Sequence, residues 1–167
     1  MIYLISGGSG SGKSKFAEDE ALKYNGRKLY IATMENKSSS AKERILKHRN
    51  MRQGKDFETL EKEKYFSDID LSAYETVLLE CLPNLTANHI YGSGSINMLY
   101  DDINYLLQWS KNLIIVTNDI SSCAINYSDE VYKYMQILNQ LACSVAKQAD
   151  IVIEVISGIP IYHKGGK

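Results

Sequence analysis

The sequence has few cysteines, almost no net charge and no long hydrophobic run. Cys81, Cys123 and Cys143 are odd in number, widely spaced and form no C-x-x-C pair, which favours reduced thiols in a cytosol over disulfides or a zinc site. The formal net charge of -1 argues against a protein-wide attraction to nucleic acid. No apolar run approaches the ~20 residues of a membrane helix, and the opening "MIYLIS" lacks the charged start and cleavage site of a signal peptide. We therefore expect a cytoplasmic protein with no membrane span and no nucleic-acid partner, in which any anion site comes from local clustering.

Apolar β-branched runs alternate with helix-like segments along the 167 residues, which we interpret as one domain, 1–167. Strands are predicted at residues 2–6, 28–33, 76–81 and 112–119, and helices at 13–24, 38–52, 97–109 and 129–147. The closing "DIVIEVISGIPIYHK" predicts two short strands about "SG", a hairpin. This alternation predicts an α/β fold, in which a mainly parallel sheet is covered on both faces and ends in a C-terminal antiparallel hairpin.

The stretch "GGSGSGKS", residues 7–14, fits the pattern G-x-x-x-x-G-K-[ST] and stands between a predicted strand and a predicted helix. Glycines there let phosphate oxygens approach backbone amides, and the helix start adds the positive end of its dipole. Lys13 would reach the β- and γ-phosphates, and Ser14 would offer a hydroxyl to Mg²⁺. The alternative is a plain glycine-rich turn. The pattern in this context predicts a nucleotide-phosphate site in a P-loop NTPase fold of the RecA-like, three-layer type.

Two acids follow predicted strands, where ligands of parallel sheets bind. Glu80 ends "VLLE" and would hold Mg²⁺ indirectly or accept hydrogen bonds from a base or ribose, unless it is a plain exposed acid. Asp119 also follows a predicted strand, but the support for its binding a ligand is weaker. The strand before it ends "TNDI", without the Asn-Lys-x-Asp that reads guanine in Ras-type GTPases. A switch GTPase is therefore disfavoured.

The stretch "SSSAKERILKHRNMR" predicts a helix, because Ser40 and Glu43 match a capping box. Arg44, His48 and Arg52 share one face of that helix. Guanidiniums bind phosphate oxygens in bidentate fashion, and a neutral imidazole can attack phosphorus as a nucleophile. From spacing alone, a solvated basic helix with a bystander histidine is favoured over a nucleophile. His89 and His163 are interpreted as bystanders.

In combination, these motifs resemble the bifunctional adenosylcobinamide kinase / adenosylcobinamide-phosphate guanylyltransferase family of cobalamin biosynthesis. The resemblance covers nearly the whole chain and is carried by "ISGGSGSGKSKFAE", "LYIAT", "RILKHRNMR", "VLLECLPNLTAN", "LIIVTND" and "VISGIP", in the family's order. It implies that His48 carries the guanylyl group, that Lys13 is catalytic and that Ser14 binds Mg²⁺. It also implies nucleotide contacts at Gly7, Gly8, Ser9, Gly10, Ser11, Gly12, Lys13, Ser14, Ala32, Thr33, Met34, Arg49, Asn50, Met51, Arg52, Glu61 and Glu80.

The resemblance further implies two linked activities in a homotrimer that uses GTP and ATP as substrates. Adenosylcobinamide, a corrinoid, would be phosphorylated, and GMP would then pass from GTP through His48 to the cobinamide phosphate, giving adenosylcobinamide-GDP. The chain departs from the family at Ser9 and Gly10, where Ala-Arg is common, and in "ISSCAINY" after "VTND". Two alternatives therefore stay open: a guanylyltransferase that has lost the kinase activity, and a P-loop regulatory ATPase.

Overall fold

The computed structural model describes residues 1–35, 43, 45–46, 50, 54–120 and 127–166. Its helices are α1 (Lys13–Ala21), α3 (Leu82–Ile90), α4 (Ile96–Trp109) and α5 (Asp129–Gln148), with 3₁₀ turns η1 (Phe66–Asp68) and η2 (Leu71–Ala73). Its strands are β1 (Ile2–Ser6), β2 (Lys28–Ala32), β3 (Glu58–Glu61), β4 (Thr76–Glu80), β5 (Asn112–Val116), β6 (Ile151–Ile156) and β7 (Ile159–Lys164). Residues 43, 45, 46 and 50 are helical as well, in agreement with the predicted helix over 38–52.

In the described part of the chain, the strands form a single seven-stranded sheet in the order β3-β2-β4-β5-β1-β6-β7. Every neighbouring pair is parallel except β6 and β7, which form an antiparallel hairpin. The predicted α/β class is confirmed: the sheet is mainly parallel, the antiparallel hairpin is C-terminal, and the glycine-rich loop joins the first strand to the first helix.

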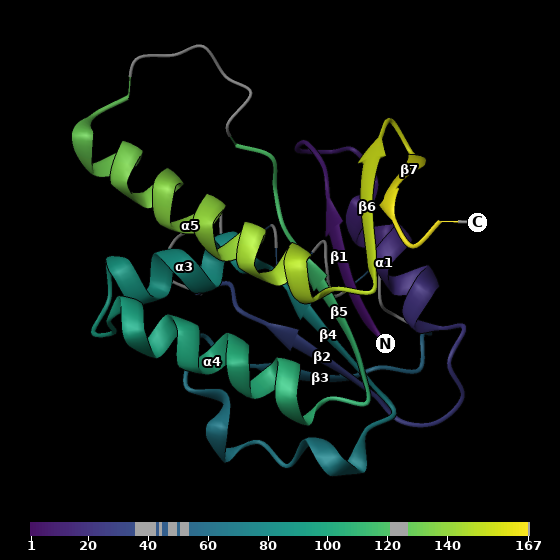
Figure 1. Ribbon diagram of the computed structural model, residues 1–167. Coiled ribbons are helices and arrows are strands. Elements are labelled where there is room, and N and C mark those ends of the chain that lie inside the picture. The colour runs from purple at the N-terminus through teal and green to yellow at the C-terminus, as the bar shows by residue number, and fades with distance from the viewer. Residues whose placement is uncertain (36–42, 44, 47–49, 51–53, 121–126, 167) are drawn as a thin grey trace.

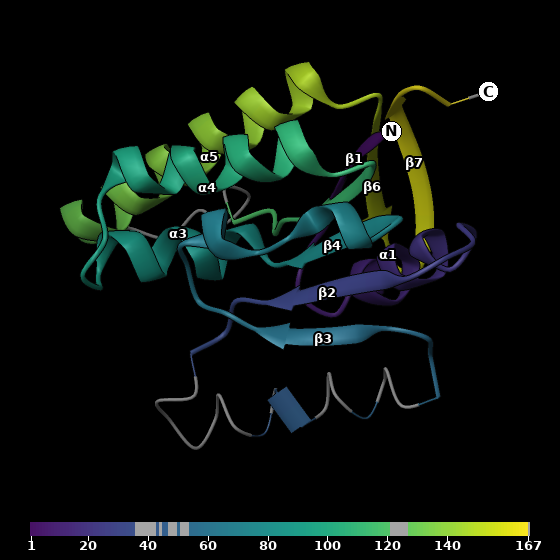
Figure 2. The same ribbon diagram turned by 90° about the horizontal axis from the view of Figure 1, so that it is seen from below.

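Helices cover both faces of the sheet (Figures 1 and 2). Alternate residues of the central strands point to opposite faces. Leu79 and Ile115 belong to the core beneath α3, α4 and α5, whereas Leu78 and Ile114 pack with Ala17 of α1 on the other face. Within the described residues, no helix combines the length and the apolar character needed to cross a membrane.

Two elements were missed by the sequence prediction. β3 is a short, largely exposed edge strand with a glutamate at each end, so it has no apolar pattern and forms through its pairing with β2. α3 contains weak helix formers, but Leu82 and Leu85 are fully buried and Pro83 lies in the first turn, where no amide hydrogen is needed. Both elements border the site described next.

Candidate active site

The glycine-rich loop runs from the end of β1 into α1, and its backbone needs glycine at specific positions. Gly12 precedes α1 with a φ of 92°, in the left-handed region. A Cβ at Gly7 would lie 2.5 Å from the Val155 carbonyl oxygen and 2.6 Å from Ser11 Oγ, so no side chain fits there. The amide groups of the first turn of α1 therefore open toward the loop, the arrangement that binds anions.

Lys13, the first residue of α1, is buried and folds back over this loop. Its Nζ donates a hydrogen bond to the Gly8 carbonyl oxygen at 3.0 Å. The ammonium group is thus already held above the loop, in reach of an anion bound by the amides. The Lys13 side chain therefore lies against the backbone of the loop, residues 7–14.

The C-terminal hairpin supports the loop from the side. The Gly158 amide donates to the Ser11 carbonyl oxygen at 2.8 Å, and Ser157 and Gly158 both have positive φ values, 51° and 83°, typical of a two-residue hairpin turn. The Asp119 amide donates to the Gly7 carbonyl oxygen at 3.2 Å. The "SG" turn and the end of "VTND" therefore hold the loop through the backbone, a role that the sequence prediction did not include.

Ser14 and Glu80 meet at the start of α1. The Ser14 hydroxyl donates to Glu80 Oε1 at 2.9 Å, and Glu80 ends β4, separated from β1 by β5 alone. A hydroxyl beside a carboxylate offers the oxygen ligands that Mg²⁺ prefers. Among the described residues, no three His, Cys, Asp or Glu side chains gather as a metal cluster. The donor set therefore fits a Mg²⁺ ion that takes its remaining ligands from water and nucleotide phosphates.

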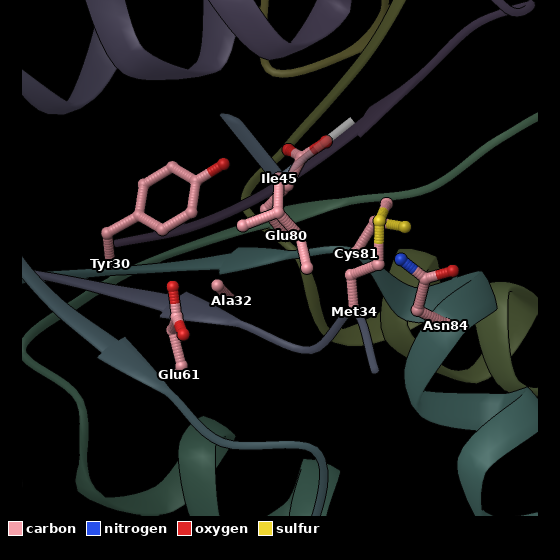
Figure 3. Close-up of a pocket in the computed structure, with 8 residues that line it drawn as sticks. All are labelled: Tyr30, Ala32, Met34, Ile45, Glu61, Glu80, Cys81 and Asn84. Carbon is pink, nitrogen blue, oxygen red and sulfur yellow. The ribbon is translucent and has the colours of Figure 1, made fainter. Parts of the chain in front are cut away.

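A pocket lies beside Glu80, on the α1 face of the sheet (Figure 3). Ala32 is in register with Glu61 on one side and with Glu80 on the other, so two carboxylates flank a small residue across three strands. The pocket has a cavity volume of about 40 Å³. It is lined by Tyr30, Ala32, Met34, Ile45, Glu61, Glu80, Cys81 and Asn84.

The pocket joins four of the predicted nucleotide-contacting residues, Ala32, Met34, Glu61 and Glu80. The prediction missed its other walls. Tyr30 could have been found from its position two residues before Ala32, on the same face of β2. Burial, followed by the charge of Glu80, raises the pKa of the Cys81 thiol to about 12, so Cys81 contributes a neutral wall and no nucleophile.

The helix predicted over residues 38–52, the histidine helix, contributes Ile45 to this pocket, which it lines together with Glu80 and Glu61 (Figure 3). Asn50, also predicted to contact nucleotide, is helical and exposed. The predictions for His48, Arg49, Met51 and Arg52 fall outside the described residues.

The structure also describes Thr33, predicted to contact nucleotide, and the two histidines interpreted as bystanders, His89 and His163. Thr33 is fully buried, and its hydroxyl contacts the backbone of Glu80 and Cys81. His89 is buried and its Nε2 lies 2.8 Å from Asp102 Oδ2. His163 lies on β7, with its Nε2 3.0 Å from Glu154 Oε2.

Comparison with known proteins adds an independent line of support. The family model described as cobinamide kinase / cobinamide phosphate guanyltransferase matches residues 3–162. The bifunctional adenosylcobalamin biosynthesis protein CobU of Escherichia coli K12 is 26% identical over 183 residues, covering 98% of this chain and 100% of the relative. Its counterpart from Salmonella typhimurium LT2 is 25% identical with the same coverage.

Among solved structures, a KaiC-like protein from Pyrococcus horikoshii matches 92% of this chain and 71% of its own, with a TM-score of 0.46 and 12% identity. The family match spans almost every described element, from β1 to β7. The chain therefore belongs to the cobinamide kinase / cobinamide phosphate guanyltransferase family.

Proposed function

We propose that this protein phosphorylates adenosylcobinamide and transfers GMP from GTP, through a guanylyl group on His48, to adenosylcobinamide phosphate. The observation that carries the proposal is the meeting of three elements at one site. The loop helix α1 contacts Glu80 through Ser14, and Glu80 lines a pocket with Ile45 of the histidine helix. The phosphate loop, through Ser14, and Ile45, a residue of the helix predicted to carry His48, are thus both associated with one carboxylate.

The triphosphate would be held by the loop, residues 7–14. Backbone amides would bind the phosphate oxygens, and Lys13 would exchange its bond to the Gly8 carbonyl for the β- and γ-phosphates. Ser14, with Glu80 beside it, would hold Mg²⁺. When bound, this ion supplies positive charge that offsets the charge of the phosphates.

The nucleoside would occupy the neighbouring pocket, next to Ala32 and Met34. A carboxylate accepts two parallel hydrogen bonds, and the N1 hydrogen and 2-amino group of guanine are two adjacent donors. Glu61, at the outer end of the row Glu61–Ala32–Glu80, would accept these two hydrogen bonds. Because the cavity of about 40 Å³ holds only a few water molecules, a base would enter by displacing the flexible side chain of Met34 or that of Ile45.

The guanylyl transfer is a double displacement at the α-phosphorus. A neutral imidazole nitrogen of His48 attacks it, the new P–N bond forms, and the bond to the β-phosphate oxygen breaks to release pyrophosphate. A phosphate oxygen of the cobinamide phosphate then attacks the same phosphorus, and the P–N bond breaks. In the predicted helix His48 follows Ile45 by three residues, hence on the same face. The guanidiniums of Arg49 and Arg52 would offset charge at the phosphorus.

The kinase step uses the other end of a bound triphosphate. The aminopropanol hydroxyl of adenosylcobinamide attacks the γ-phosphorus, its proton leaves, and the bond to the β-phosphate oxygen breaks. Catalysis would come from positioning by Lys13 and the loop amides. ATP or GTP would serve as phosphate donor. We also propose a homotrimer in the cytoplasm, with the corrinoid as second substrate.

The decisive experiment is incubation with α-³²P-GTP and Mg²⁺, followed by denaturation. We expect an acid-labile, alkali-stable label on the wild-type protein that is absent from His48→Ala. The matched control is His163→Ala, which removes an imidazole on β7, outside the residues that line the pocket, and should retain the label. Retention of the label in His48→Ala would refute the nucleophile assignment.

A second candidate is a guanylyltransferase without kinase activity, favoured by Ser9 and Gly10 in place of the family's usual Ala-Arg. Assaying phosphorylation of cobinamide separately from guanylyl transfer distinguishes the two. A regulatory P-loop ATPase would instead show slow hydrolysis and no label on histidine.

A further inference from the structure

A chain of buried hydrogen bonds links the ends of the three strands that carry the pocket. It begins at Thr33, the residue after β2. The Thr33 amide donates to the Glu80 carbonyl oxygen at 3.0 Å, and its hydroxyl lies 3.1 Å from that oxygen and 3.0 Å from the Cys81 carbonyl oxygen. The Cys81 amide donates back to the hydroxyl at 2.9 Å. The end of β2 is thus fixed to the end of β4.

Asn88 of α3 continues the chain to β3. Its side-chain nitrogen donates one hydrogen bond to the Thr33 carbonyl oxygen at 2.8 Å and another to the Glu63 carbonyl oxygen at 2.9 Å. Asn88 is 7% exposed; its bond to Thr33 is buried and its bond to Glu63 is partly buried. One buried amide therefore connects Thr33, which precedes Met34 after β2, with Glu63, which lies two residues after Glu61 at the end of β3.

The rest of the β3 loop is fixed to the same side of the molecule. The Asp102 carboxylate accepts hydrogen bonds from the Tyr65 and Phe66 amides at 2.8 and 2.7 Å. His89, the neighbour of Asn88 on α3, binds the same carboxylate. Asn88 therefore adds a side-chain link at Glu63, between the backbone bond of the Lys62 amide to the Ala32 carbonyl oxygen at 3.0 Å and the segment anchored by Asp102.

We propose that Thr33 and Asn88 are positioning residues that hold the segments after β2, β3 and β4 in place around the pocket, and hence select the nucleoside part of a bound nucleotide. The pairing of the strands places Glu61 and Glu80 themselves. Neither side chain lines the pocket among the described residues; each acts through the backbone that carries a lining residue. This assigns Thr33 an indirect role in place of the predicted direct contact. The inference rests on the proposed function only in taking the ligand to be a nucleotide.

The proposal separates two parts of the ligand. The phosphate loop is built from β1, α1 and the β6–β7 turn, and its backbone bonds and the Lys13 bond to Gly8 do not involve Thr33 or Asn88. The Ser14 hydroxyl does contact Glu80, at the site proposed for Mg²⁺, so the two parts are compared without the metal ion. Loosening the link should therefore weaken contacts to the nucleoside and leave those to the phosphates. A general loss of structure would weaken both.

The test compares binding of GTP and of inorganic tripolyphosphate, each in EDTA so that the metal site at Ser14 and Glu80 takes no part, by calorimetric titration. Thr33→Val keeps the branched shape and removes the hydroxyl, whereas Thr33→Ser keeps the hydroxyl. Asn88→Asp replaces the donor nitrogen by an oxygen facing two carbonyls. We expect Thr33→Val and Asn88→Asp to raise the Kd for GTP at least about tenfold, the scale of a lost buried hydrogen bond, with the Kd for tripolyphosphate unchanged. Thr33→Ser should bind GTP nearly as the wild type does.

Matched controls are available for both changes. Thr76→Val alters a buried threonine at the opposite end of β4, and Asn97→Asp alters an exposed asparagine on α4; both should bind the two ligands normally. Where Asn88→Asp does not fold, the Thr33→Val and Thr33→Ser pair decides. Unchanged GTP affinity in Thr33→Val, or an equal loss for GTP and tripolyphosphate, overturns the proposal.

Failure of the proposed function gives a different result. If the wild type binds ATP and not GTP, the same comparison is made with ATP, and the positioning role stands while the guanine assignment falls. The assay does not involve His48, so a missing histidine label leaves its outcome unaffected.

Discussion

The ion pair between Glu18 and Lys55 offers a quantitative test of how the loop helix is held. Glu18 lies on α1, four residues after Ser14, and its side chain is 1% exposed; Lys55, which precedes β3, is 22% exposed. Lys55 Nζ lies 2.5 Å from Glu18 Oε2. The pair joins the helix that begins the phosphate site to the segment that leads into β3. The substitution Lys55→Met keeps the apolar stem of the side chain and removes its charge.

The expected cost follows from the burial of Glu18. Removing one partner of a buried ion pair typically costs about 3–5 kcal/mol, because the other charge is left without compensation. For chains of 150–250 residues, 1 kcal/mol lowers Tm by about 2–4 °C, so Lys55→Met should lower it by about 6–20 °C. Removing both charges is often neutral. The double variant Glu18→Gln/Lys55→Met should therefore be more stable than Lys55→Met alone.

The cycle consists of the wild type, Glu18→Gln, Lys55→Met and the double variant. Their thermal and urea unfolding, followed by circular dichroism, measures the coupling free energy between Glu18 and Lys55. The control is Lys15→Met, which removes the lysine of an exposed pair with Asp19 on the same helix; its Tm should stay close to that of the wild type, since exposed pairs contribute little. A wild-type Tm for Lys55→Met, or strictly additive losses in the double variant, would show that the pair does not stabilise α1 as reasoned here.

Two further predictions concern the pocket and the metal ligand. Because burial raises the pKa of Cys81 to about 12, only about one in 10⁴ of its thiols is ionised at pH 8. Iodoacetamide should therefore modify the exposed Cys143 well before Cys81, as measured by mass spectrometry. Equal modification rates for the two cysteines in the folded protein would contradict the burial of Cys81. Ser14→Ala removes a ligand proposed for Mg²⁺, so GTP affinity should fall in Mg²⁺ and match the wild type in EDTA, by calorimetric titration; an equal loss in both buffers would argue against a role in metal binding.

Much of the fold could be predicted from the sequence because its central strands are continuous apolar runs. Residues 76–80 and 112–116 are buried on both faces, and such strands have a pattern that does not depend on their neighbours. β3 and α3 could not be predicted in this way. Each exists through tertiary contacts, β3 by pairing with β2 and α3 by burying Leu82 and Leu85, and local propensity gives no sign of either.

The site could be predicted only in part, for a similar reason. The phosphate loop is contiguous in sequence, so its residue types and spacing suffice. The pocket takes its walls from four separate stretches of sequence, residues 30–34, 45, 61 and 80–84. The spacing of Glu61 and Glu80 follows from the β3-β2-β4 order, which no local pattern encodes. Asn88 looks in sequence like any polar helix residue; its two buried hydrogen bonds become visible only when the loops after β2 and β3 are brought together.

The arrangement of loop and pocket also bears on why two reactions could share one domain. Lys13 and the loop amides hold the β- and γ-phosphates of a nucleotide in proteins of this kind, and the nucleoside would lie beyond Glu80, over Ala32 and beside Glu61. The α-phosphorus of such a ligand must then lie between the loop and the pocket, beside the helix that contributes Ile45. A nucleophile for the α-phosphorus would therefore come from that helix, whereas an acceptor of the γ-phosphoryl group would approach at the loop end. A single bound triphosphate would present both reactive centres but could undergo only one of the two reactions. The kinase and guanylyltransferase steps should accordingly compete for one nucleotide site.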